Sequence, residues 1–132
     1  MPTVHKMLSS PLMCAPVGPW SNAIEIIPGA RYIFTAGLVG DKPDGTFDTD
    51  IFSQTEQTFR NLVSILHAGG MNLDHVVKLS VYLSDLANQP RYAEARSAAL
   101  GNRRPAMSLF EVASLAAPAL LIEIEAIAAK HD

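Results

Sequence analysis

Two carboxylates lie within the most apolar stretch of the sequence, and they are the residues best suited to proton transfer. Glu123 and Glu125 belong to residues 120–128, whose alternating pattern predicts a β-strand. In a strand both glutamates lie on one face, about 7 Å apart. A glutamate flanked by apolar neighbours in a cleft could handle a water proton. The alternative is that both lie on a solvated sheet face. The opposite face would carry Ile122, Ile124, Ala126 and Ala128.

The other residues with reactive side chains give weaker support for a catalytic or metal-binding role. Cys14 would need a base nearby to act as a nucleophile, and a single cysteine is more often a small packed hydrophobe. Ser108 lacks the glycine-flanked elbow of a serine hydrolase. No glycine-rich phosphate loop is present, and we expect neither a metal nor a cofactor. The histidines, which lack metal-ligand spacing, are His5, His67, His75 and His131.

Composition narrows the classes of function. The 132 residues suit one domain, and 48% hydrophobic against 17% charged residues is a low charge content that favours oligomerisation. A net charge of −3 with scattered lysines and arginines argues against nucleic-acid binding. Apolar runs stay shorter than a membrane span, and one cysteine cannot form an internal disulfide. We therefore expect a cytoplasmic protein without a membrane partner.

The periodicity predicts the elements that must position these residues. Helices are expected at residues 50–68, capped by Thr49 or Asp50 and closed by Gly69-Gly70, and at residues 90–100, ending at Gly101. Strands are expected at residues 3–8, 23–27, 32–37, 76–83, 106–112 and 120–128, and the second and third are expected to form a hairpin. The expected fold class is α+β, a six-stranded mixed sheet with two helices on one face. The other sheet face would be solvated or meet another subunit.

Several segments together resemble the reactive-intermediate deaminase family, also called Rid or YjgF and labelled endoribonuclease L-PSP. They are Gly18-Pro19-Trp20-Ser21, Phe34-Thr35-Ala36-Gly37, Arg104-Pro105-Ala106-Met107-Ser108 and Ile122-Glu123-Ile124-Glu125-Ala126-Ile127. The resemblance covers nearly the whole chain, as a single domain over residues 1–132. It implies a chorismate-mutase-like fold and a homotrimer that binds a small-molecule ligand in a cleft at each subunit boundary.

The resemblance also implies site residues, with departures. Glu123 matches a glutamate that orients the attacking water, and Ser108, which is next to the position of the lost arginine, is the other catalytic candidate. Met107 stands where deaminating members have an arginine that binds the substrate carboxylate, and a thioether cannot supply charge-assisted hydrogen bonds. Arg104 is the nearest candidate for a replacement cation, although a solvated loop charge is the favoured interpretation of this residue. The other implied substrate-binding residues are Trp20, Ala36, Gly37 and Leu109.

Two functions from different classes follow from these residues. The first is hydrolysis of a small imine or enamine whose carboxylate is absent or bound differently, with Glu123 positioning water. The second is a trimer without catalytic activity whose cleft binds a small metabolite or partner, since Met107 and Trp20 make that cleft more apolar. The ribonuclease label is disfavoured because the sequence has no basic groove.

Overall fold

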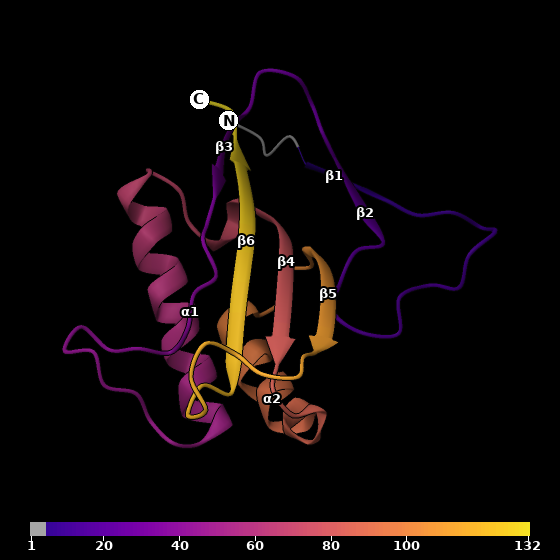
Figure 1. Ribbon diagram of the computed structural model, residues 1–132. Helices are drawn as coiled ribbons and strands as arrows, with labels where there is room; N and C mark the ends of the chain where they lie inside the picture. Colours follow the sequence, from indigo (N-terminus) through magenta and orange to yellow (C-terminus); the bar gives the residue numbers. More distant parts are fainter. Residues whose placement is uncertain (1–4) are drawn as a thin grey trace.

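The computed structural model describes residues 5–132, and its strands and helices form two layers (Figure 1). Residues 3 and 4 of the first expected strand lie outside the described range. Two short 3-10 turns, Leu73–His75 and Leu86–Asn88, precede β4 and α2. The elements are β1 (His5–Leu8), β2 (Ala23–Ile26), β3 (Arg31–Phe34), α1 (Ile51–Ala68), β4 (Val76–Leu83), α2 (Gln89–Leu100), β5 (Ala106–Glu111) and β6 (Ile122–Lys130).

The strands divide into two sheets. Four of them form a mixed sheet in the order β3-β6-β4-β5, in which β4 and β5 are parallel and the other pairs are antiparallel. The remaining two, β1 and β2, pair with each other in an antiparallel ribbon. The expected hairpin between β2 and β3 is therefore wrong. The turn at Gly29, with φ of 98°, leads the chain away from β2, and β3 pairs with β6 instead.

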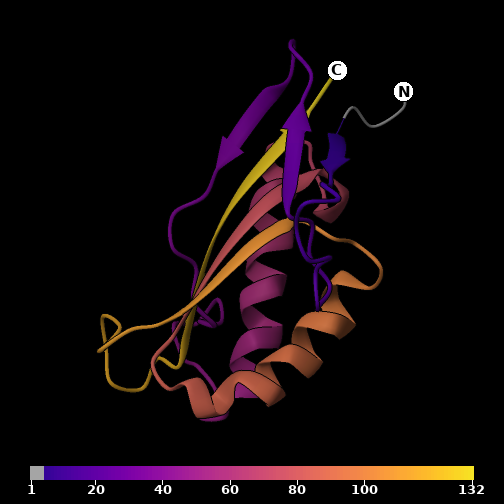
Figure 2. The ribbon, with the colours of Figure 1, turned by 90° about the vertical axis from the view of Figure 1, so that its right-hand side faces the viewer.

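Both helices cover the same face of the four-stranded sheet, as expected (Figure 2). The core lies between these layers and is built from Leu79, Val81 and Leu83 of β4, the alternate residues of β6, and the inner faces of the helices. Along β6 the residues Ile122, Ile124, Ala126 and Ala128 are buried, which confirms the predicted alternation. Neither helix of residues 5–132 is both long and apolar enough to cross a membrane.

Helix α1 begins and ends where its capping residues predict. The Asp50 carboxylate accepts a hydrogen bond from the Ser53 amide, and the hydrogen bond lowers the pKa of Asp50. Gly69 and Gly70 close the helix, with φ of 71° at Gly70. The buried face is more polar than the periodicity predicts, because it includes Gln54, Thr55 and Thr58.

Helix α2 starts one residue earlier than expected and ends at Gly101, whose φ of 59° suits glycine. Its buried residues are Tyr92, Ala95, Arg96 and Leu100. The buried face of this helix thus contains an arginine. This helix packs against α1 and against the underside of the edge strand β5, where the Tyr92 hydroxyl lies 3.9 Å from Met107 Sδ.

Candidate functional site

Glu123 lies on the sheet face that the helices leave uncovered, next to Gly37. A Cβ at Gly37 would be only 2.6 Å from Glu123 Cδ, so the carboxyl group rests directly on the glycine backbone. The segment after β3 is held there by paired hydrogen bonds between Leu38 and Ile124, of 2.7 and 2.9 Å. Glu123 is half-buried, whereas Glu125 is exposed. The two glutamates share a face, as predicted, but differ in their surroundings.

A hollow of about 400 Å³ opens beside Gly37 and is walled by residues of the following loop. Asn61 of α1 fixes this loop, since its amide donates to the carbonyls of Val39 and Asp41, each over 2.8 Å. The exposed Ala36 precedes Gly37 on the same segment. Among residues 5–132 the Gly37 amide has no hydrogen-bond acceptor, so it can still donate to a ligand.

A second group of predicted residues gathers at β5, on the opposite edge of the sheet. Ser21 forms a parallel bridge with Ala106, and its hydroxyl donates to the carbonyl of Arg104 over 2.5 Å. The half-buried Trp20 therefore lies beside the start of β5, with its ring folded over Gly18. The Arg104 side chain is exposed and forms no ion pair within residues 5–132.

Met107 and Leu109 lie on the face of β5 that the helices cover, where both are half-buried against the core. In the strand register, Met107 of β5 is opposite Leu79 of β4. Glu123 of β6, on the other side of β4, is opposite Tyr82. Met107 and Glu123 thus lie on opposite faces of the sheet and two strands apart. One copy of the chain does not bring the two into a single cleft.

Ser108 lies on the uncovered face of the sheet, and its hydrogen-bond partner there is a lysine. Lys78 Nζ donates to Ser108 Oγ over 2.9 Å. On the same face Tyr82 donates to Glu125 over 2.8 Å, and this hydrogen bond raises the pKa of the Tyr82 phenol. The neighbour of Ser108 across β4 and β6 is Glu125, not Glu123. Sequence reasoning missed both Lys78 and Tyr82, although alternation along β4 places them on this face.

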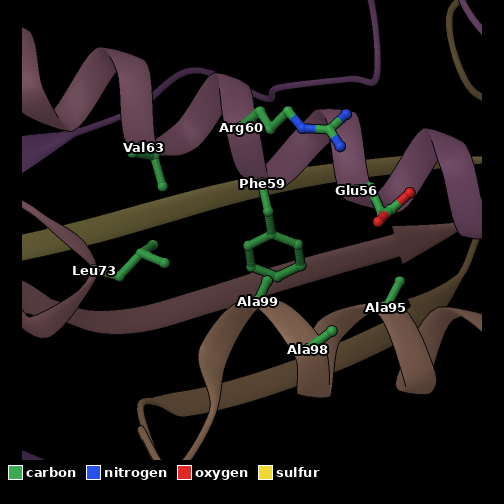
Figure 3. A pocket seen from close by; sticks show the side chains of 8 residues that line it. All are labelled: Glu56, Phe59, Arg60, Val63, Leu73, Ala95, Ala98 and Ala99. Carbon is green, nitrogen blue, oxygen red and sulfur yellow. The ribbon is translucent and has the colours of Figure 1, made fainter.

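Another hollow, of about 350 Å³, lies between the two helices (Figure 3). Phe59 of α1 points toward Ala99 of α2, and Glu56 and Arg60 follow the rim of the hollow. This hollow is in the helix layer and contains none of the residues predicted for the site. The site residues instead lie along the two edges of the sheet.

Comparisons with known proteins agree on one family. The model of the family described as Endoribonuclease L-PSP matches residues 11–130. A RutC family protein of Pyrococcus abyssi is 38% identical over 118 residues, covering 88% of this chain and 90% of that protein. A 2-iminobutanoate/2-iminopropanoate deaminase of Mus musculus is 30% identical, covering 95% of this chain and 91% of that protein.

A solved structure shows the same fold. The crystal structure of a protein of the conserved Rid family from Yersinia pestis superposes with a TM-score of 0.82 at 32% identity. The match covers 95% of this chain and 98% of the crystallised one. The two-layer arrangement of a mixed sheet under two helices is therefore shared with that family.

Proposed function

The chain belongs to the Rid family, whose model is described as Endoribonuclease L-PSP, and we propose that it hydrolyses a small imine or enamine. The reaction takes place in a cleft completed by a second copy of the chain. Glu123 orients the attacking water. The observation that carries this proposal is the placement of the half-buried Glu123 carboxyl group against the backbone of Gly37, a residue that lines an open hollow.

The geometry around Glu123 suits hydrolysis of a carbon–nitrogen double bond. A water held by the carboxylate attacks the imine carbon, and Glu123 accepts the water proton. Proton transfer to nitrogen then allows the carbon–nitrogen bond to break, which releases ammonia and leaves a carbonyl product. The unused Gly37 amide supplies a hydrogen-bond donor for the substrate at this place. Deaminase activity in the mouse relative supports this reaction type.

The division of the site residues supports assembly of several copies, and we propose a homotrimer. Glu123 and Gly37 lie near one edge of the sheet, and Trp20 and Met107 lie near the other. In a cyclic assembly the same two unlike edges meet at every boundary, so each boundary could hold both groups. The uncovered face also carries large exposed side chains, including Phe34 at 71% exposure, which a partner would cover.

The experiment compares two conservative variants. A lyase generates 2-iminopropanoate or 2-iminobutanoate in solution, semicarbazide traps the remaining imine, and ammonia release is followed. Glu123→Gln should lower the rate by about 100-fold or more because the proton acceptor is lost. Glu125→Gln is the matched control and should retain most activity, since Glu125 is exposed and bonded to Tyr82.

Three outcomes would contradict hydrolysis at Glu123. One is an equal loss of activity in both variants, and another is loss of the assembled state in Glu123→Gln alone, which would make the residue structural. The third is an absence of activity in the unmodified protein toward every imine tried. That result would favour the second candidate, a trimer that binds a small metabolite or partner, for which the half-buried Met107 is the specific observation.

A further inference from the structure

The hollow of about 350 Å³ between α1 and α2 has no part in the candidate site described above. Its floor is apolar and buried, because Phe59 is 2% exposed and Ala95 is 1% exposed. Phe59 points toward the small Ala99 of α2, so one large side chain faces small ones across the hollow (Figure 3). The volume lies near the lower end of the range for ligand pockets, about 300–1,000 Å³. It therefore suits a small molecule.

Two side chains of opposite charge follow the rim of this hollow (Figure 3). Glu56 and Arg60 lie one turn apart on α1, and a glutamate four residues before an arginine commonly forms an ion pair. Arg60 Nη1 instead donates to the neutral Gln57 Oε1 over 3.4 Å. Within residues 5–132 the ion pairs are formed by Arg31, Lys42, Arg91, Arg103 and Lys130, with acidic residues other than Glu56. Both rim charges are therefore available to a bound molecule.

The arrangement of charged and apolar groups around the hollow indicates the chemistry of its ligand. A carboxylate on the ligand would pair with the planar guanidinium of Arg60, and an ammonium group would pair with Glu56. Cβ atoms four residues apart on a helix are separated by about 5–6 Å, so the two ligand groups must be close to each other. A hydrocarbon part would then contact Phe59 and the alanines of α2. A fatty acid or a simple amine would leave one of the two rim charges unpaired.

We propose that this hollow binds an α-amino acid with an apolar side chain. The carboxylate and ammonium groups of such a molecule are attached to one carbon atom, which matches the single helical turn between Glu56 and Arg60. Its side chain covers apolar groups that water reaches in the free protein, such as Val63, Leu73 and Ala98. Glu123 lies on the opposite face of the sheet, so this site is separate from the one proposed for hydrolysis.

Calorimetry with L-leucine and the unmodified protein tests this binding. We expect a Kd of about 1 mM or tighter, since a ligand of this size has few atoms with which to form contacts. Three analogues each lack one group: 4-methylpentanoate lacks the ammonium group, 3-methylbutylamine lacks the carboxylate, and glycine lacks the apolar side chain. Each analogue should bind more weakly than L-leucine by about threefold or more. Titration followed by nuclear magnetic resonance measures the weaker ligands.

Two substitutions on the rim should affect different groups of the ligand. Arg60→Gln should weaken the binding of L-leucine by about threefold to tenfold and leave that of 3-methylbutylamine unchanged, because the amine has no carboxylate. Glu56→Gln should weaken the binding of L-leucine by a similar factor and leave that of 4-methylpentanoate unchanged. Arg91→Gln is the matched control, since this exposed arginine of α2 pairs with Glu94 and does not line the hollow.

Filling the hollow tests the site while both rim charges are kept. Ala98 is exposed and lines the hollow, so the larger side chain of Ala98→Leu would take the place of the ligand without entering the core. This variant should weaken the binding of L-leucine by about tenfold or more. Ser97→Leu, at the neighbouring exposed position outside the hollow, should change the Kd by less than about twofold. Circular dichroism and light scattering compare the folding and mass of each variant with those of the unmodified protein.

Several results would overturn the proposal. One is an unchanged affinity for L-leucine in the folded variants of Arg60, Glu56 and Ala98. Another is loss of L-leucine binding in Glu123→Gln, since the amino acid would then occupy the site proposed for hydrolysis. A third is the absence of detectable binding at about 10 mM L-leucine. None of these measurements uses imine turnover, so their outcome is independent of the function proposed above.

Discussion

The carboxyl group of Glu123 rests on the backbone of Gly37, with no room for even a methyl group between them. A Cβ at residue 37 would be 2.6 Å from both Cδ and Oε2 of Glu123. We expect Gly37→Ala to push the carboxyl group away and to lower hydrolysis by about 100-fold, since small misplacements of a catalytic group are costly. Ammonia release from an imine generated in solution measures the effect.

A second substitution tests whether crowding is the cause. Glu123→Asp shortens the side chain by one methylene group and removes Cδ and Oε2, the two atoms that a Cβ at Gly37 would meet at 2.6 Å. The double variant Gly37→Ala with Glu123→Asp should therefore show no further loss beyond that of Glu123→Asp alone. Additive losses would mean that Gly37 acts through its own backbone and not through the position of the carboxyl group.

Gln54 links α1 to the segment that enters β6. Its buried amide donates to the carbonyls of Asp48 and Ala119, and its oxygen accepts from the Leu121 amide, all within 2.9 Å. Gln54→Leu would leave these backbone groups without partners and should lower the free energy of unfolding by about 2–4 kcal/mol. Urea denaturation measures this, and Gln89→Leu, at an exposed position, should change it by less than about 0.5 kcal/mol.

The proposed homotrimer can be tested on the uncovered sheet face. Phe34 is 71% exposed there, and its ring is tilted by 39° to the Tyr32 ring with the centroids 6.2 Å apart. Phe34→Glu should dissociate the assembly because it places a charge in an apolar contact. Light scattering at micromolar concentration gives the mass. Ile65→Glu, which alters an exposed residue of α1 on the opposite layer, should leave the trimer intact. A mass of one or two subunits for the unmodified protein would refute the trimer.

The partial burial of His75 should make the stability of the protein depend on pH. Its Nδ1 atom accepts a hydrogen bond from the Asn72 amide over 3.0 Å, and partial burial lowers its pKa below the usual 6.5. The unfolded chain therefore binds the proton more readily than the folded protein does. The stabilisation is present above the pKa of the unfolded state and is lost as pH falls through the folded pKa.

The measurement is urea denaturation between pH 7.5 and 5, a range chosen to bracket the ordinary histidine pKa of about 6.5. His75→Gln should show a shallower decline in unfolding free energy than the unmodified protein, since glutamine has no proton to bind here. His67→Gln, at an exposed position of α1, should keep the original slope. Identical slopes in all three proteins would mean that the burial of His75 does not contribute to the pH dependence.

Local patterns predict the elements well and the pairing of strands poorly. Asp50 and the glycine pair at residues 69–70 mark the ends of α1, because capping depends on neighbouring residues only. Alternation along β6 likewise separates Glu123 from the core. The choice of β6 over β2 as the partner of β3 depends on distant parts of the chain, which periodicity does not encode.

The candidate site is predictable in part for the same reason. Its residues can be named from short segments of the sequence. Their division between the two edges of the sheet depends on the strand order, which only the structure shows. Lys78 and Tyr82 were missed because alternation shows which face they share but not which strands bring them beside Ser108 and Glu125.

Glu123 and Met107 lie on opposite faces of one sheet. The proposed assembly therefore predicts complementation between variant subunits. Two chains that are inactive for different reasons should restore each other's activity when they are expressed together. In an equal, random mixture of Glu123→Gln chains and Trp20→Ala chains, about a quarter of the boundaries would combine an intact Glu123 with an intact Trp20. Coexpression should therefore recover hydrolysis that neither variant shows alone, whereas chains that carry both substitutions should recover none when they are coexpressed with Glu123→Gln chains.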